Sequence, residues 1–147
     1  MAKRTDMDHG LLLLIVAILA WIVPGAGHFF IKERRRAAII FVTITATFLV
    51  GLYVGSIAIV DPVGAWPWYI GQMLASPTVA IIPEAARQFA EIGPDGNAIP
   101  LVSYGRPHDF GQIYTAIAGA MNLLAIISAV YMAHSGHGEI IGSQEDE

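Results

Sequence analysis

The sequence predicts an all-α integral membrane protein with three transmembrane helices and a proline-rich, partly interfacial connection between the second and the third. Of its 147 residues, 55% are apolar and only 14% are charged, and the apolar residues gather in long uncharged runs. Soluble domains average about 25% charged residues. The whole chain, residues 1–147, is therefore expected to form a single membrane domain.

The first expected helix covers about residues 10–30, a run of 21 residues without a charged side chain. At 1.5 Å per residue, this length matches a hydrocarbon core of about 30 Å. Because Pro24 lacks a backbone donor and Gly25 follows it, we expect a kink or an early helix end near Val23. A cleaved signal peptide is the alternative interpretation, since two basic residues precede the apolar run.

A basic hairpin at residues 31–36 and a second helix at about residues 37–60 follow. Residues 37–60 contain no charged side chain and are long enough to cross a bilayer with some tilt. The hairpin holds Lys32, Arg34, Arg35 and Arg36. Positive residues in short loops tend to stay in the cytoplasm, so the hairpin is expected there.

Residues 61–111 are expected to form an extramembrane connection, because seven of the eight prolines lie in this stretch. Trp66, Trp68 and Tyr69 follow the second helix and are expected to be interface anchors, since amphipathic rings favour the headgroup level. The apolar segment 68–82 is short and interrupted by proline. This favours an interfacial or re-entrant helix over a crossing.

The third expected helix covers about residues 112–133, and an acidic tail, residues 134–147, follows it. Residues 112–133 contain no ionisable side chain apart from two tyrosine phenols. Three crossings place the two termini on opposite sides of the membrane. With the basic hairpin in the cytoplasm, the N-terminus is expected outside and the C-terminus in the cytoplasm.

Two blocks of the chain resemble a known family. The first is residues 21–30, WIVPGAGHFF, with the basic run after it, and the second is residues 108–124, HDFGQIYTAIAGAMNLL. They are similar to the helix, Pro-Gly-x-Gly-His-Phe/Tyr turn, basic patch and helix of a family of small bacterial membrane proteins of unknown function, and to its last helix. That family is reminiscent of two-transmembrane-helix domain proteins. The resemblance implies a bacterial inner-membrane location and no known chemistry. At Lys32 and Glu33 the chain departs from the family pattern, where the turn commonly continues with Gly-Arg.

The hairpin is the first candidate site. Gly25 and Gly27, in the turn before it, permit positive backbone dihedrals, so exposed amides beside a basic cluster could hold an anion such as a lipid phosphate. The residues assigned to this anion or lipid-headgroup site are Gly25, Gly27, His28, Lys32, Arg34, Arg35 and Arg36. The alternative is a glycine turn that only reverses the chain while the arginines set the topology.

Five residues are assigned to helix packing. Gly51 and Gly55 form a GxxxG pattern, which lets another helix approach closely. Thr115, Gly119 and Asn122 share one face of the third helix, and an amide at membrane depth needs a hydrogen-bond partner. Interhelical contact is therefore favoured over a transport site.

No constellation of residues supports catalysis, and no cofactor or metal is expected. The chain has no cysteine. Two tail patterns, His134-x-x-His137-x-Glu139 and Asp6-x-Asp8-His9, contain metal-ligand residue types but lack the supporting residues that hold ligands in place. A net charge of -4 with few, local basic residues argues against nucleic acid as a partner.

The expected function is a structural or accessory subunit of a larger membrane assembly. Its expected partners are membrane lipid and other membrane protein subunits or further copies of the chain. The alternative is a small homo-oligomeric pore or lipid-handling protein, with Thr43, Thr47 and Asn122 lining a polar path. A membrane enzyme that uses His28 and the three arginines on a phospholipid is a third hypothesis.

Overall fold

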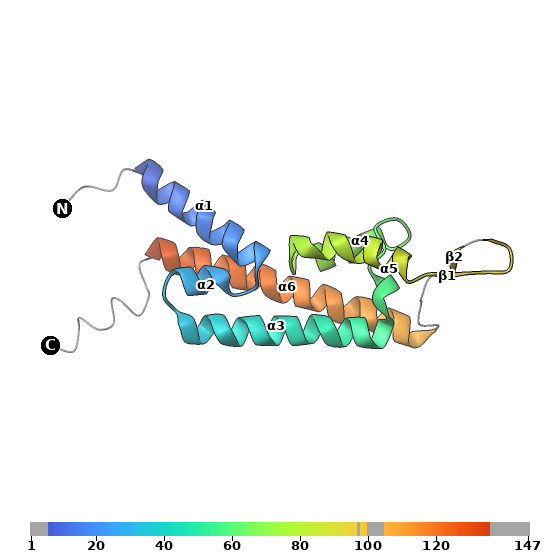
Figure 1. The fold of residues 1–147 in the computed structure, drawn as a ribbon. Coiled ribbons are helices and arrows are strands. Elements are labelled where there is room, and N and C mark those ends of the chain that lie inside the picture. The colour runs from blue at the N-terminus through green and yellow to red at the C-terminus, as the bar shows by residue number, and fades with distance from the viewer. Residues whose placement is uncertain (1–5, 97, 100–104, 136–147) are drawn as a thin grey trace. The chain divides into compact units, whose positions relative to one another are not determined.

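The computed structural model describes residues 6–96, 98–99 and 105–135, and it is predominantly helical, as predicted (Figure 1). The chain divides into two compact units, one of residues 1–43 with 122–147 and one of residues 44–121. In chain order the elements are α1 (Asp6–Ile22), α2 (Ala26–Phe30), α3 (Arg34–Gly55), the 3-10 turn η1 (Ile57–Ile59), α4 (Trp66–Met73), the 3-10 turn η2 (Pro77–Ile81), α5 (Ile82–Gln88), β1 (Glu91–Ile92), β2 (Ala98–Ile99) and α6 (Arg106–Ser135).

Two of the described helices, α3 and α6, are long and apolar enough to cross a membrane. The prediction of three transmembrane helices is therefore wrong in number. The expected first helix, residues 10–30, is divided into α1 and α2. The apolar part of α1, His9–Ile22, reaches only about 21 Å at 1.5 Å per residue, which is short of a hydrocarbon core of about 30 Å.

The break between α1 and α2 lies where the sequence predicts it, since α1 ends at Ile22. Pro24 cannot donate a helical hydrogen bond. Gly25 adopts a left-handed backbone with φ 84°, and a Cβ atom on it would lie 2.5 Å from the carbonyl oxygen of Ala37. Glycine is thus required here both by the dihedral and by the close approach of α3.

Within the first unit, α1 runs along the C-terminal part of α6. Near the start of α1, His9 Nε2 lies 3.1 Å from His134 Nδ1. Near its end, the Ala20 carbonyl accepts a hydrogen bond from Asn122 Nδ2 at 3.3 Å. The twelve residues between positions 122 and 134 correspond to about 18 Å of helix. α1 therefore begins beside the C-terminal end of α6 and ends near Asn122.

α2 returns along the same part of α6. His28 Nε2 lies 3.3 Å from Ser128 Oγ, and a Cβ atom on Gly27 would lie 3.1 Å from the Cβ of Ala129. In the first turn of α3, Arg36 donates a hydrogen bond to Met132 Sδ at 3.4 Å. Together α1 and α2 form a helical hairpin whose two ends lie near the same end of α6.

The second unit has its own small core. Ile59, Val60 and Val79 are buried there, and Tyr69 and Met73 of α4 pack against them. The expected extramembrane connection, residues 61–111, thus contains ordered helices. It also contains a short antiparallel pair of strands that the sequence did not predict, in which Glu91 pairs with Ile99 and Ile92 with Ala98.

α6 presents small or polar residues to its neighbours in both units. Its fully or nearly buried positions recur at spacings of three and four residues: Gly111, Thr115, Ala118, Asn122, Ala125 and Ala129. Such spacing places them on one face of the helix. The helix extends beyond the expected range of 112–133 at both ends, and α3 begins and ends before the expected 37–60. The arginine run is consequently the first turn of α3 and not a loop.

Candidate functional site

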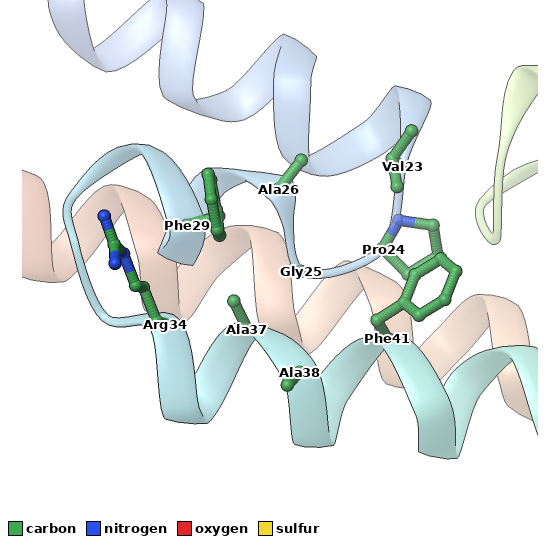
Figure 2. A pocket seen from close by; sticks show the side chains of 9 residues that line it. All are labelled: Val23, Pro24, Gly25, Ala26, Phe29, Arg34, Ala37, Ala38 and Phe41. Carbon is green, nitrogen blue, oxygen red and sulfur yellow. The ribbon is translucent and has the colours of Figure 1, made fainter.

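A pocket of about 310 Å³ lies between the α1–α2 turn, α2 and the first turns of α3 (Figure 2). Its lining residues all belong to the first unit. They are Val23, Pro24, Gly25, Ala26, Phe29, Arg34, Ala37, Ala38 and Phe41. All are apolar except Arg34, so the pocket is an apolar hollow with one charged group at its edge.

Arg34 stands at one end of this pocket, beside Phe29, as Figure 2 shows. Its guanidinium carbon lies 5.9 Å from the centre of the Phe29 ring. This is within the range of a cation–π contact. The neighbouring acid, Glu33, instead lies 3.7 Å from Arg36. The described part of the chain therefore pairs Arg34 with an aromatic face and not with a carboxylate.

The floor of the pocket is one face of α3. Arg34, Ala37, Ala38 and Phe41 are spaced i, i+3, i+4 and i+7, which places them in one line along the helix. From Arg34 to Phe41 this line is about 10 Å long. The pocket thus runs from a guanidinium at the beginning of a candidate membrane span into its apolar part.

The seven residues predicted for an anion site are only partly brought together. Gly25 and Arg34 line the pocket. Gly27 and His28 are buried, and His28 makes its hydrogen bond with α6. Three basic residues, Lys32, Arg35 and Arg36, are exposed and lie outside the pocket lining.

Lys32 adopts the left-handed backbone with φ 70° in the turn between α2 and α3. This conformation is unfavourable for a residue with a Cβ atom and is the one that glycine adopts freely. It occurs where the chain departs from the resembled turn pattern. The turn between α2 and α3 therefore places a lysine in a strained backbone conformation.

His28 is the buried polar group of the hairpin, with 1% of its surface exposed. Burial lowers the pKa of its imidazole below the ordinary value, the charge of Arg36 acts in the same direction, and Glu33 opposes both. The neutral ring is favoured. His28 therefore adds no positive charge to the basic cluster near neutral pH.

The predicted packing residues lie at close approaches between helices. In the second unit, a Cβ atom on Gly51 would lie 2.7 Å from Thr115 Cγ2, and one on Gly55 would lie 2.8 Å from the Cα of Gly111. A Cβ atom on Gly119 would collide with the carbonyl oxygen of Gly71 in α4. In the first unit, Asn122 binds the Ala20 carbonyl.

Gln72 of α4 is a buried polar residue that the sequence analysis missed. It is fully buried, and its Nε2 atom donates to Thr115 Oγ1 at 2.9 Å and to the Ile59 carbonyl at 3.4 Å. Thr115 in turn donates to the Gly111 carbonyl at 2.9 Å. In the sequence, Gln72 could have been recognised as the single side-chain amide in the apolar segment 68–82.

The predicted interface anchors differ in their surroundings. Trp66 and Trp68 are 60% and 41% exposed, whereas Tyr69 packs against the core of the second unit. The ring positions favour the two tryptophans as the residues free to reach a headgroup region.

One histidine from each of the two tail patterns considered for metal binding lies next to the other. His9 and His134 are neighbours, with ring centres 5.3 Å apart. His137 and Glu139 lie outside the described residues. Within the ranges that the structure describes, no group of three or more histidine, cysteine or acidic residues gathers as a metal site would require.

A sequence profile described as "Family of unknown function (DUF6677)" matches residues 15–139. The chain belongs to this family. The match begins inside α1 and covers α2, all the residues that line the pocket, and α6. No curated protein and no solved structure shows a significant match to the chain.

Proposed function

We propose that this DUF6677 protein crosses the membrane twice, through α3 and α6, and that α1 and α2 form a re-entrant hairpin. The hairpin contacts along α6 support this topology, because both of its ends lie toward His134 and its tip lies near Asn122. The basic residues 32–36 favour the cytoplasmic side for that end. Both the beginning of α1 and the end of α6 are then cytoplasmic, which replaces the expectation of an external N-terminus.

In the second unit, α4 packs beside α6, as α1 and α2 do in the first unit. Gly71 faces Ala116, and Ala75 reaches the level of Gly119. Gln72 satisfies its amide nitrogen internally through Thr115. Backbone and side-chain polar groups at membrane depth need such internal partners. We assign α4 to a re-entrant segment; it begins two residues before the 68–82 range where the sequence favoured one and overlaps it.

The proposed role is that of a non-catalytic structural or accessory subunit of a larger membrane assembly. One observation carries it: α3 leaves a continuous apolar stripe exposed, whereas the buried polar groups are used in packing. Only 17% of the most apolar stretch of α3 is buried. The stripe contains Ile39, Val42, Ala46, Leu49 and Tyr53, spaced three and four residues apart. This is the spacing with which a helix packs on a partner helix.

Partners of this stripe are other membrane subunits or a second copy of the chain, with lipid around them. The pore alternative stays a prediction. Asn122, which it places on the polar path, is fully buried and bonded to Ala20. The enzyme hypothesis also stays a prediction, with His28 buried and outside the pocket lining.

Site-specific photo-cross-linking tests the accessory role. A photoreactive amino acid at Leu49, in the stripe, is compared with one at Leu11, which is equally exposed at 57% on α1. In native membranes, Leu49 is expected to give one discrete protein adduct, identified by mass spectrometry as a membrane subunit or a second copy, and Leu11 is expected to give none. Lipid adducts alone at both positions would contradict the proposal.

A further inference from the structure

The pocket between the α1–α2 turn and α3 combines an apolar wall with a single exposed guanidinium. Its volume of about 310 Å³ is that of a small-molecule site at the lower end of the usual range. The line from Arg34 to Phe41 is about 10 Å long, so the pocket fits the first part of a slender apolar chain.

The charge lies at one end of the pocket, which is the arrangement that an amphiphile requires. Arg34 is at the first residue of α3, and the apolar line through Ala37 and Ala38 to Phe41 continues along that helix (Figure 2). If α3 spans the membrane, Arg34 lies at the headgroup level and Phe41 lies deeper. A headgroup on Arg34 and a hydrocarbon chain toward Phe41 would both be in their preferred surroundings.

The local charges favour an anionic headgroup. Residues 31–36 contain four basic residues and one acid, Glu33, which lies beside Arg36. The Arg34 guanidinium carbon lies over the Phe29 ring at 5.9 Å from its centre, and such a contact does not use the guanidinium N–H groups as hydrogen-bond donors to an oxygen. A planar fork of donors matches a phosphate better than it matches a carbonyl or a hydroxyl group.

We propose that this pocket binds one acyl chain of an anionic phospholipid, and that Arg34 donates hydrogen bonds to its phosphate. The site is separate from the exposed stripe of α3, so it does not depend on the accessory role, but it rests on the proposed crossing of the membrane by α3. It also differs from the anion site that the sequence suggested, because the ligand is held by the hydrocarbon wall and by Arg34 instead of by glycine amides and the whole basic run.

Native mass spectrometry of the detergent-purified full chain tests the proposal, with phosphatidylglycerol and phosphatidylcholine of the same acyl chains as probes. We expect one phosphatidylglycerol per chain, bound several-fold more tightly than phosphatidylcholine. Both lipids present a phosphate to Arg34, but the choline ammonium of phosphatidylcholine is repelled by the basic residues of segment 31–36. Inorganic phosphate is expected not to displace it, because phosphate alone gains nothing from the apolar wall. Displacement by phosphate, or equal binding of the two lipids, would overturn the proposal.

Two matched pairs of variants locate the site. Arg34→Gln is expected to weaken phosphatidylglycerol binding about tenfold, whereas Arg35→Gln, which removes the same charge outside the pocket, is expected to change it about twofold or less. Ala38→Phe fills the pocket and keeps every charge, so it should abolish the bound lipid. Ala120→Phe, at an exposed alanine of α6 outside both the pocket and the stripe, should not.

Each pair can refute the assignment on its own. Equal losses in the two arginine variants would mean that the basic run attracts lipid only through its total charge. Unchanged binding in Ala38→Phe would mean that the pocket is not the site. A protein adduct or a dimer that Ala38→Phe abolishes, with no lipid bound to the parent chain, would show a protein occupant and overturn the proposal. Far-UV circular dichroism checks that each variant keeps its helices.

Discussion

The contact between α3 and α6 at Gly51 is tight enough for one methyl group to test it. A Cβ atom on Gly51 would lie 2.7 Å from Thr115 Cγ2 and 3.0 Å from the carbonyl oxygen of Gly111. The carbonyl belongs to the backbone of α6 and cannot rotate away, so the helices must separate. Overpacking of this kind costs about 1 to 3 kcal/mol.

Gly10 supplies the matched control for Gly51→Ala. It lies in α1, and a Cβ atom on it would meet nothing within 4 Å. Replacing a helical glycine by alanine stabilises the helix by about 0.5 to 1 kcal/mol when space allows. Because both variants gain this propensity, their difference in free energy of unfolding isolates the steric cost. We expect Gly51→Ala to be less stable than Gly10→Ala by about 1 to 3 kcal/mol.

The assay is reversible unfolding of the chain in mixed micelles with increasing denaturing detergent, followed by circular dichroism. Gly55→Ala is expected to act in the same direction, because its Cβ atom would lie 2.8 Å from the Cα of Gly111. If Gly51→Ala and Gly10→Ala unfold at the same detergent fraction, α3 and α6 do not meet at this face.

Three further predictions use the same unfolding measurement. Gln72→Leu is expected to destabilise the second unit by about 1 kcal/mol, since it removes the hydrogen bond to Thr115, and an unchanged stability would show that this bond contributes nothing. Lys32→Gly is expected to stabilise the chain by up to about 1 kcal/mol, because the left-handed backbone costs about 1 to 2 kcal/mol for a residue with a Cβ atom and glycine loses part of this in chain entropy. For His28 the pKa in the folded chain lies below the unfolded value of about 6.5, so the unfolded state binds the proton first and stability falls as the pH decreases from about 6.5 toward the folded pKa. His28→Gln should therefore lose less stability than the parent chain between pH 7.5 and pH 5.5. Equal losses in the two chains would contradict a buried neutral ring.

The sequence indicated where the first helix breaks but not where the chain goes afterwards. The break follows from the residue types of Pro24 and Gly25. Pro24 lacks a backbone donor, and Gly25 permits the left-handed backbone and leaves room for the Ala37 carbonyl oxygen. Whether α2 continues across the membrane or returns depends on contacts with α6, more than 90 residues later in the chain, at Asn122 and Ser128. A run of uncharged residues has the right length for either path.

The composition of the pocket was likewise beyond prediction from sequence. Its lining comes from the α1–α2 turn, α2 and α3, and it selects Arg34 from four neighbouring basic residues. Arg34 lines the pocket because it lies three, four and seven residues before Ala37, Ala38 and Phe41 in α3 and so shares their face of the helix. Arg35 lies on a different face. From the sequence the arginines were expected in a loop, where residues three and four apart do not share a face.

Cysteine cross-linking in the cysteine-free chain tests the re-entrant hairpin most directly. The pair His9→Cys and His134→Cys replaces two rings whose nitrogens lie 3.1 Å apart, and a short bifunctional thiol reagent is expected to join them in native membranes. The pair His9→Cys and Leu123→Cys is the control, since position 123 lies about 16 Å from position 134 along α6, and it should remain unjoined. If α1 instead crosses the membrane, His9 and His134 lie on opposite sides, about 30 Å apart, and the absence of the first cross-link would contradict the two-span topology.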